Sequence, residues 1–479
     1  MKTQCLQRML IGLVLALVVV PWALAADRYV ATNGTGGGTS WTDTHSNLIA
    51  MVALAGDNDT VYVTNNAKYY LTNQITVTNA ITVRSWGPGG IYDPTNTIID
   101  ANYPNAPTTN RHFTLSNYWA TLAGFTLTNG WGSGNTNNTG NAGANGGSIY
   151  LYYGTVTNCI ITRNYAFNTN ASVNSGGGGI IMGIDSAKSG SVWNCTISGN
   201  AAYRYGGGIL VRDGNWRILN CTIVGNSVQA AGYEGGGIEM CTQSGVAVVS
   251  NCWVVSNSAG YGGGLKMVYN AECYSSFIVG NTSTHQGGGI RIGNGSGVIR
   301  NCLITYNYSS GGNSWGGGIA ASSNPKIQNC TIASNYCAQE GGGLDFSNYD
   351  GFPKVENTII WGNRANANGG INSNYFVSRS NATYAVITFT NCCTSPNIVS
   401  TNSVATEVNT ITNDPRFVQA ATDNYRLQSS SPCINAGVNR DWMEGARDLY
   451  GNRRIDNFRK TVDIGAHEYL SQGTMFRGH

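Results

Sequence analysis

The amino-acid sequence predicts an all-β protein: a right-handed parallel β-helix of about nine or more turns with a short N-terminal capping helix. The chain has 479 residues with 64 Gly and only 11% charged residues, a composition that disfavours long helices. Two short sequence words alternate along its middle, and one of them recurs every 25 to 31 residues. A repeat of this length is typical of a solenoid, whose units bury their apolar faces by stacking. Right-handedness follows from the usual hand of parallel crossovers.

The first segment predicts a secretory signal peptide. Lys2 and Arg8 precede an apolar run over 9–20, so we expect residues 1–25 to be removed after Ala25. The apolar run is too short for a comfortable membrane span, and no later stretch could cross a membrane. We therefore expect a monomeric protein that is secreted, either extracellular or at a cell surface. The formal charge of +3 gives no reason to expect a nucleic-acid partner.

Residues 26–111 are predicted to form an N-terminal cap and the first irregular turns. The run 47–55 is the one convincing short helix and ends at Gly56. A helix placed here would cover the open end of the solenoid, whose strand edges need a cap. Strand-like runs follow it at 60–63, 75–77 and 81–83.

Regular repeats are expected over residues 112–373, where the first word is Gly-Gly-Gly followed by Ile or Leu. These glycines are expected at a corner that needs a positive φ or a close approach between turns. The word begins at Gly177, Gly206, Gly235, Gly262, Gly287, Gly316 and Gly341, with weaker copies at 146–149 and 369–371.

The second word is Asn-Cys-x-Ile-x-x-Asn, and its closing Asn is expected at another corner. Asn tolerates the left-handed conformation, and stacked amides can form hydrogen bonds from turn to turn. The closing residues, with degenerate copies of the word included, are Asn129, Asn164, Asn200, Asn226, Asn257, Asn281, Asn307, Asn335 and Asn363.

The cysteine of each second word is expected to point into the core, because it shares a strand face with the Ile two places on. Stacking would bring these residues within disulfide reach, but we favour a column of free, buried thiols. No His lies at ligand spacing for zinc. The residues are Cys159, Cys195, Cys221, Cys252, Cys302 and Cys330.

Residues 374–479 are predicted to hold the last turns and a C-terminal cap, because the repeat decays there. This region reads Asp414-Pro-Arg-Phe-Val, then Ser431-Pro-Cys-Ile-Asn-Ala-Gly, Asp448-Leu-Tyr-Gly-Asn-Arg-Arg-Ile and Val462-Asp-Ile-Gly-Ala-His-Glu-Tyr. With Tyr29-Val-Ala-Thr-Asn-Gly near the N-terminus, it resembles secreted bacterial right-handed parallel β-helix proteins of the choice-of-anchor type, within the pectin-lyase-like superfamily. The repeated words also resemble those of polymorphic outer-membrane adhesins. The resemblance implies the fold, and it leaves open lyases, hydrolases, epimerases and non-enzymatic surface proteins.

The second residue after each Gly triplet should face outward, one per turn. This column reads Tyr150, Ile181, Leu210, Glu239, Lys266, Arg291, Ala320, Asp345 and Asn372. Glu239, Lys266 and Arg291 would then lie on three successive turns of an exposed face, roughly 5 Å apart.

Two interpretations of these three charges stay open. They could stabilise the sheet as ion pairs between neighbouring strands. They could instead perform β-elimination on a uronic-acid polymer, with Lys266 or Arg291 neutralising the carboxylate and removing the C5 proton. Glu239 would orient that pair or help to hold Ca²⁺, although a single carboxylate is a poor basis for a Ca²⁺ site. We expect no other cofactor.

An aromatic row is predicted just before the triplets, where it could stack on sugar rings or cover apolar surface near a corner. Its members are Tyr205, Tyr233, Tyr261, His285 and Trp315. No pair of Asp residues occupies adjacent positions of the charged column, which disfavours inverting hydrolysis. His467 lies inside the terminal motif and is assigned a structural role.

The sequence therefore leads to two functional hypotheses. The first is a secreted or cell-surface β-helix protein that is non-catalytic, adhesin-like and directed to extracellular polysaccharides. The second is a polysaccharide lyase that cleaves a uronic-acid polymer through Lys266, Arg291 and Glu239.

Overall fold

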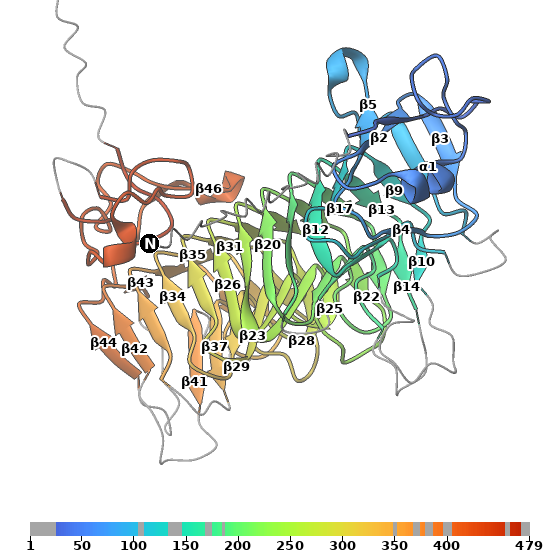
Figure 1. The fold of residues 1–479 in the computed structure, drawn as a ribbon. Coiled ribbons are helices and arrows are strands. Elements are labelled where there is room, and N and C mark those ends of the chain that lie inside the picture. Colours follow the sequence, from blue (N-terminus) through green and yellow to red (C-terminus); the bar gives the residue numbers. More distant parts are fainter. Residues whose placement is uncertain are drawn as a thin grey trace, which may run out of the picture.

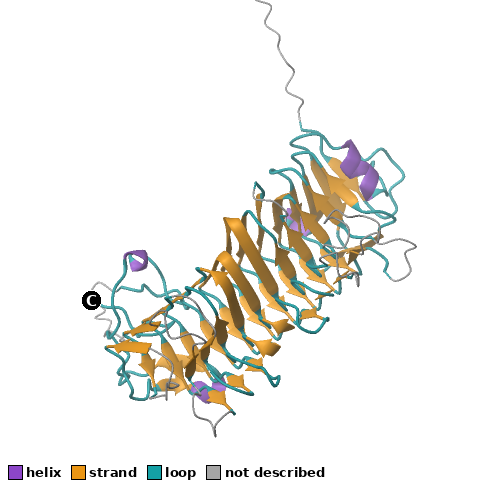
Figure 2. Cartoon of the chain, turned by 90° about the horizontal axis from the view of Figure 1, so that it is seen from below, coloured by secondary structure: helices purple, strands orange, loops and turns teal. Residues whose placement is uncertain are grey.

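The computed structural model shows a right-handed parallel β-helix, a rod of stacked turns with a cap at each end (Figure 1). It describes residues 25–470 except 104–109, 133–145, 168–174, 184–186, 348–351, 367–373, 379–386, 396–404 and 456–459. The predicted signal peptide therefore lies outside the described residues, except for Ala25. In the part of the chain that is described, no helix is long and apolar enough to cross a membrane. Every strand pairing between turns is parallel, and Figure 2 shows the strands stacked along the rod.

Each regular turn contributes strands to four positions around the rod. The first position, directly after the Gly triplet, is formed by β4 (Ile75–Val77), β7 (Phe113–Leu115), β11 (Ile149–Leu151), β15 (Ile180–Met182), β19 (Ile209–Val211), the starts of β23 (Ile238–Ser250) and β26 (Leu265–Tyr274), β29 (Ile290–Gly295), β33 (Ile319–Ala321), β37 (Leu344–Ser347) and β41 (Tyr375–Ser378). The second position is formed by β1 (Arg28–Val30), β2 (Thr60–Thr64), β5 (Thr82–Trp86), β8 (Thr121–Ala123), β12 (Tyr153–Thr157), β16 (Ser189–Trp193), β20 (Asn215–Leu219), the ends of β23 and β26, β30 (Val298–Arg300), β34 (Lys326–Gln328), β38 (Lys354–Glu356), β42 (Ile387–Thr390) and β44 (Ala405–Val408).

The other two positions form separate sheets. The third is formed by β3 (Ala67–Tyr70), β6 (Thr97–Asp100), β9 (Thr126–Thr128), β13 (Ile160–Thr162), β17 (Thr196–Ser198), β21 (Thr222–Val224), β24 (Trp253–Val255), β27 (Phe277–Val279), β31 (Leu303–Thr305), β35 (Thr331–Ala333), β39 (Ile359–Trp361) and β43 (Cys393–Thr394). The fourth is formed by β10 (Trp131–Gly132), β14 (Tyr165–Ala166), β18 (Ala201–Ala202), β22 (Ser227–Val228), β25 (Ser258–Tyr261), β28 (Thr282–Gln286), β32 (Tyr308–Ser309), β36 (Tyr336–Cys337) and β40 (Arg364–Ala365).

The interior is a continuous apolar core with a column of thiols. The six predicted cysteines are all free and buried, as the second word predicts. The backbone N–H of Cys159 donates to Cys195 Sγ at 3.5 Å, and that of Cys252 donates to Ser276 Oγ at 3.1 Å. Ser276 thus takes the thiol position in a degenerate copy of the word, which keeps the column continuous.

The closing Asn side chains form a buried hydrogen-bond ladder that runs up the rod, as predicted. Each amide Nδ2 donates to the Oδ1 of the Asn in the following turn, at 2.9–3.2 Å from Asn164 through Asn363 to Asn374. The backbone N–H of the same residue donates to that Oδ1 as well, and Nδ2 also donates to a carbonyl of the preceding turn. Asn374 ends the ladder by donating to Ser395 Oγ at 2.6 Å.

The prediction that the closing Asn residues are left-handed is wrong, because the positive φ occurs at another residue of the word. From Asn164 to Asn363 none of them has a positive φ, and the backbone N–H and Nδ2 of each donate to the Oδ1 of the next Asn. The opening Asn of the word is the left-handed residue. Its φ is between 48° and 58° at Asn158, Asn194, Asn220, Asn251, Asn301, Asn329 and Asn357.

Two of the predicted repeat copies are out of register. Thr126 pairs with Ile160, so Asn129 aligns with Arg163, and Gly130 takes the place of Asn164. Asn129 is accordingly left-handed, with a φ of 58°, and is not part of the ladder. Tyr375 pairs with Leu344 and Phe376 with Asp345, so β41 rather than Ile371 and Asn372 continues the first position. The predicted copy at 369–371 lies outside the described residues.

The Gly triplets meet both requirements predicted for them. The first Gly has a positive φ in every described copy, for example 70° at Gly235. The second approaches the next turn so closely that a Cβ on Gly236 would lie 2.3 Å from the Gly263 carbonyl oxygen. Any side chain at this position would separate the turns.

The N-terminal cap contains the predicted helix. Helix α1 (Leu48–Leu54) begins at the N-cap Asn47, whose side chain accepts a hydrogen bond from the Ala50 N–H at 3.1 Å. It buries Leu48, Met51 and Val52 against the end of the core. The amphipathic helix therefore closes the open end of the apolar interior.

The C-terminal cap folds back along the third sheet (Figure 1). It contains the antiparallel pair β45 (Phe417–Gln419) and β46 (Asn424–Leu427) and the 3-10 turns Ala420–Thr422 and Asp441–Met443. Besides apolar contacts, it forms hydrogen bonds with the opening Asn side chains of the last turns. Asn357 donates to the Val438 carbonyl at 2.8 Å and accepts from the Val438 N–H at 2.8 Å.

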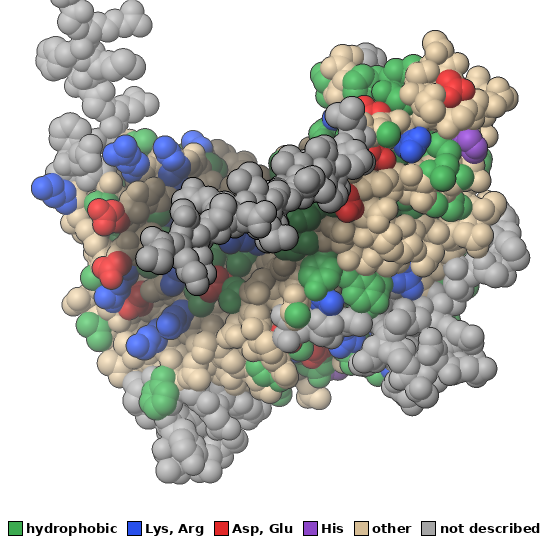
Figure 3. Space-filling view, viewed as in Figure 1, with side chains coloured by type: hydrophobic (Ala, Val, Ile, Leu, Met, Phe, Trp, Pro, Cys, Tyr) green, Lys and Arg blue, Asp and Glu red, His purple; other side chains and the backbone are tan. Residues whose placement is uncertain are grey.

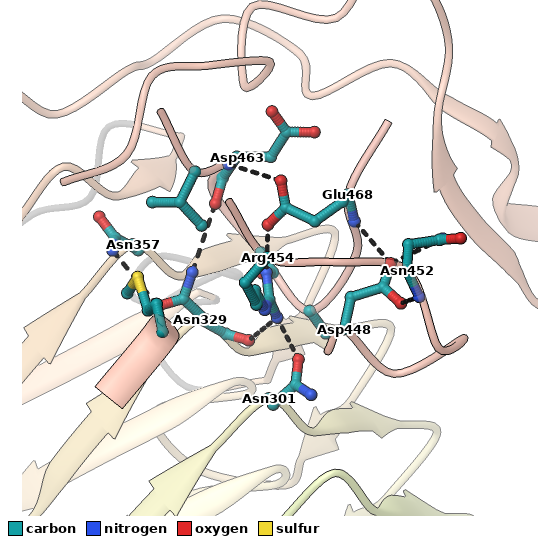
Figure 4. Close-up of polar contacts among 12 residues, drawn as sticks. Asn301, Asn329, Asn357, Asp448, Asn452, Arg454, Asp463 and Glu468 are labelled. Carbon is teal, nitrogen blue, oxygen red and sulfur yellow. Dashed lines mark hydrogen bonds and ion pairs between the residues drawn. The ribbon is translucent and has the colours of Figure 1, made fainter. Parts of the chain in front are cut away.

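Arg454 is the centre of this docking (Figure 4). Its guanidinium is fully buried and donates to Glu468 Oε1 at 2.7 Å, to the Gly465 carbonyl at 2.9 Å and to Asn301 Oδ1. His467 is also buried in this cap, and burial lowers its pKa to about 4. The terminal motif of the sequence is thus a structural clasp.

Candidate functional site

The predicted charged column exists in the first position of the rod. Glu239 on β23 pairs with Leu210 and Lys266, and Lys266 on β26 pairs with Arg291 on β29. The column continues through Ala320 to Asp345. Its members alternate with fully buried core residues, such as Ile238 and Met240 beside Glu239, so their side chains leave the strands on the outer side.

The column is far less exposed than predicted. Glu239 is 5% exposed and Lys266 is 6% exposed, while Arg291 is partly buried. The lower column members Tyr150, Ile181 and Leu210 are buried as well and pack with the Tyr205 ring from the neighbouring corner. Neighbouring turns and corner residues therefore cover a face that the alternation pattern alone predicts to be open.

Glu234, which the sequence reasoning missed, connects the charged column to the corner. Lys266 Nζ lies 2.5 Å from Glu234 Oε1 in an ion pair whose lysine is almost fully buried. Glu234 pairs with Tyr205 and Tyr261 in the adjacent turns, so it lies between two of the predicted aromatic residues. Its position directly before the Gly235 triplet was the available signal, because the same place holds Tyr205, Tyr261 and Trp315 in other turns.

Glu239 is an incompletely satisfied buried carboxyl group. Its Oε2 has no hydrogen-bond partner among the described residues. Desolvation, and secondarily the negative charge of Glu234, raise the pKa of Glu239 to about 8, against the opposing charges of Arg212 and Lys266. The carboxyl is therefore mainly protonated at neutral pH and can donate a proton or a hydrogen bond.

Arg291 is held in place by its own strand and by the next turn. One guanidinium nitrogen donates to the Ile292 carbonyl, and another donates to Ser322 Oγ at 3.1 Å. Desolvation lowers the pKa of Arg291, whereas the charges of Glu234 and Asp345 raise it. The cluster thus contains cations and carboxyl groups of Glu234, Glu239 and Asp345 within one electrostatic neighbourhood.

The predicted aromatic row is not continuous: it consists of two pairs of contacting rings and Trp315, whose ring belongs to neither pair. The corner column reads Tyr205, Glu234, Tyr261, Gln286, Trp315 and Glu340, so Tyr233 and His285 lie one residue out of register. Their rings still contact the row: Tyr205 and Tyr233 meet edge to face at 5.4 Å, and Tyr261 stacks on His285 at 4.8 Å. Arg212 lies over the Tyr205 ring at 5.4 Å, and Arg204 over that of Tyr233 at 5.1 Å.

The described residues contain no group of three or more His, Cys, Asp or Glu side chains arranged to hold a metal ion. The two carboxyl groups nearest to one another along the chain here are Glu239 of the charged column and Glu234 of the adjacent corner column. Lys266 already supplies a positive charge to Glu234. A Ca²⁺ ion at this place would have to displace that ammonium group.

Comparison with known proteins identifies similar folds. Neither the protein-family models nor the curated proteins match this sequence. Among solved structures, the chain is similar to pectate lyase Pel9A, with 15% identity, a TM-score of 0.49, and coverage of 93% of this chain and 96% of that one. It is similar to alginate lyase AlyF-OU02 with G6, with 13% identity, a TM-score of 0.44, and coverage of 94% and 97%. A third is the Agl-KA catalytic domain, with 13% identity, a TM-score of 0.44, and coverage of 73% and 62%. These comparisons concern the fold, and the choice-of-anchor and adhesin resemblances stay predictions.

Proposed function

We propose that this protein is a secreted β-helix protein that binds an extracellular polysaccharide at the corner formed by Tyr205, Tyr233, Glu234, Tyr261 and His285. The observation that supports this most strongly is the position of Glu234. It stands between aromatic residues of the corner column and is ion-paired with Lys266 of the charged column. Stacking surfaces and charged groups are therefore adjacent at one edge of the rod.

The chemistry of the corner suits a sugar chain. The rings of Tyr205 and Tyr233 offer apolar faces for the C–H side of a pyranose, because aromatic groups carry a large apolar surface with a polar tip. Arg212 lies over the Tyr205 ring, is only partly buried, and can donate hydrogen bonds to hydroxyl or carboxylate oxygens. The turn spacing of roughly 4.8 Å is close to the length of one sugar residue, so a chain running along the rod would meet a new turn at each residue.

Affinity electrophoresis through gels containing neutral or uronic-acid polysaccharides tests this proposal. The double variant Tyr205→Ala, Tyr233→Ala should lose roughly 2- to 13-fold in affinity per ring, from about 0.5–1.5 kcal/mol each. Tyr308→Ala, Tyr336→Ala is the matched control, because those rings contact each other at 5.0 Å on the fourth sheet. Equal retardation of both variants in every gel would refute the corner site.

A lyase is the second candidate, favoured by the register of Lys266 and Arg291 beside a protonated Glu239. In β-elimination a base removes the C5 proton of a uronate, the C4–O bond breaks, and a C4–C5 double bond forms. The departing oxygen takes a proton, which Glu239 could give, while Arg291 would neutralise the carboxylate. Lys266 could act as the base only after separating from Glu234.

The appearance of unsaturated sugar ends, followed by ultraviolet absorbance, separates the two candidates. Under the lyase hypothesis a panel of uronic-acid polymers yields such ends, and Lys266→Ala abolishes them. Product formation that survives Lys266→Ala would remove the catalytic assignment. Binding without product across the panel supports the non-catalytic function.

A further inference from the structure

A cationic cavity lies in the C-terminal cap, away from the corner site. Its volume is about 720 Å³, and it is lined by Arg440, Arg447, Arg453 and Lys460, with Asp441 and Glu444 as the acidic lining residues. Figure 3 shows Lys and Arg side chains gathered at this end of the molecule, on the left of the view. Among the lining residues that the structure describes, four cations against two carboxylates is a marked excess in a chain with so few charges.

Two of these arginines are brought face to face by a tight turn. Arg447 and Arg453 are partners in an antiparallel bridge, and Asp448 Oδ1 fixes the turn by accepting from the N–H groups of Tyr450 and Asn452 at 2.9 and 2.7 Å. Directly opposite residues of such a pair start roughly 4.5–5.5 Å apart on the same face, and like charges there are destabilising. Within the described chain neither arginine forms an ion pair with a carboxylate. An anion between them would turn a repulsive contact into an attractive one.

A third arginine supplies an unused donor. Arg440 Nη2 donates to Glu356 Oε1 at 2.6 Å, which fixes the guanidinium beside the end of β38. Its Nε is buried and has no acceptor among the described residues. A buried donor without a partner is unfavourable, which is why such groups are rare unless a ligand or water satisfies them.

The walls of the cavity are tied together. Asn439 Nδ2 donates to the Lys460 carbonyl at 2.6 Å, and the Val462 N–H donates to Asn439 Oδ1 at 3.0 Å. The segment that carries Lys460 is thereby fixed to the segment that carries Arg440. The cationic lining is preorganised, which lowers the entropy cost of binding.

We propose that this cavity binds the oxyanion groups, carboxylate or sulfate, of an acidic polysaccharide. A polymer is favoured over a small ion because the cationic surface continues onto the sheet. Glu356, the partner of Arg440, is on the same strand as Lys354, which is exposed and pairs in register with exposed Lys326. The site is separate from the proposed corner site and does not depend on it.

The test compares charge variants in affinity electrophoresis through polygalacturonate and through neutral dextran. Arg447→Ala, Arg453→Ala should weaken retardation by polygalacturonate about tenfold or more, since charge-assisted hydrogen bonds to two guanidinium groups are lost. Arg163→Ala, Arg364→Ala removes the same charge from exposed arginines elsewhere and should leave retardation nearly unchanged. Dextran should retard none of them through this site.

Several results would overturn the proposal. One is absence of polygalacturonate binding by the unaltered protein, and another is equal weakening in the control pair. Sulfate ion binding as tightly as the polymer would overturn the polymer assignment, and single-stranded RNA binding as tightly would overturn the polysaccharide assignment. A several-degree fall in the melting temperature of Arg453→Ala alone would show a structural role instead, because relief of like-charge repulsion should leave that temperature unchanged or raise it. The loss caused by Arg447→Ala, Arg453→Ala should be the same in the unaltered protein and in the Tyr205→Ala, Tyr233→Ala background, so failure of either proposal is distinguishable from failure of the other.

Discussion

The closing Asn ladder and the charged column are both buried polar arrays that follow the rod axis, but they differ in how well their hydrogen bonds are satisfied. In the ladder, each amide from Asn200 to Asn307 donates twice through Nδ2 and accepts twice through Oδ1. In the charged column, Glu239 Oε2 and Arg291 Nε are buried without a partner in the described structure.

The difference separates architecture from candidate function. A fully satisfied buried network specifies one register between turns, because any slip would leave several amides unpaired. A partly satisfied network costs stability that a purely structural site has no reason to bear. The charged column is therefore the better candidate for binding or catalysis, whereas the ladder is assigned a structural role.

The largest effect is expected from removing Arg454, because its buried guanidinium donates hydrogen bonds from both terminal nitrogens. Arg454→Ala leaves Glu468 without its partner and should cost about 3–5 kcal/mol, as for other broken buried ion pairs. Thermal unfolding together with limited proteolysis would show both the loss and an exposed C-terminal cap. The neighbouring, exposed Arg453→Ala is the control and should stay within about 0.5 kcal/mol of the unaltered protein. Similar losses in both variants would contradict the clasp assigned to Arg454.

Breaking the ladder in its middle should have the next largest effect. Asn257→Ala deprives the backbone N–H and Nδ2 of Asn226 of their acceptor and leaves Asn281 Oδ1 with the backbone N–H of residue 257 as its donor from this turn. Unsatisfied buried groups cost about 1–3 kcal/mol each, so a loss of about 3 kcal/mol is expected in urea unfolding after partial relaxation. A loss below about 1 kcal/mol would mean that the ladder contributes little to stability.

The stability that Glu239 of the charged column contributes should depend on pH. The pKa of Glu239 is raised to about 8 from the ordinary value of 4.5, so between these values the folded chain holds a proton that the unfolded chain releases. Its contribution to stability is therefore full below about pH 4.5 and is lost as the pH rises through about 8. Glu239→Gln should match the unaltered protein at pH 5 and exceed it in melting temperature at pH 8. Parallel pH profiles for the two proteins would contradict the burial of an ionisable Glu239.

The smallest effect is expected at Asn220, an exposed opening Asn away from the C-terminal cap. Asn220 is exposed and has a φ of 53°. Asn220→Gly removes strain from the left-handed backbone while increasing the freedom of the unfolded chain, so the two effects should cancel to within about 0.5 kcal/mol. A loss in urea unfolding comparable to that of Asn257→Ala would show that the two Asn positions of the word are not energetically distinct.

The repeat words were sufficient to predict the fold, the inward thiols and the amide ladder. Each rests on a local requirement that recurs in every turn, such as the positive φ of Gly235 or the strand face shared by Cys221 and Ile223. The position of the left-handed residue was predicted wrongly because both Asn residues of a word satisfy the same preference. Only the ladder geometry decides between Asn220 and Asn226.

The candidate site was predicted only in part, for a physical reason. The register of Glu239, Lys266 and Arg291 follows from the triplets, but their burial depends on corner segments whose lengths vary between turns. Glu234 and the offset of Tyr233 and His285 arise in those segments. The cationic cavity could not be predicted at all, because Arg440 and Arg453 meet only after the C-terminal cap folds back along the rod.

The hydrogen bonds of the amide ladder all run in one direction along the rod. Every Nδ2 donates toward the C-terminal end, so an unfinished ladder would offer a donor at that end that another molecule's ladder could accept. Asn374 gives this donor to Ser395, and the C-terminal cap covers the adjacent turns. Stacked parallel strands without such a stop are a template for fibre growth. The hydrogen bond from Asn374 to Ser395 therefore ends the ladder within one molecule, and losing it would favour head-to-tail filaments.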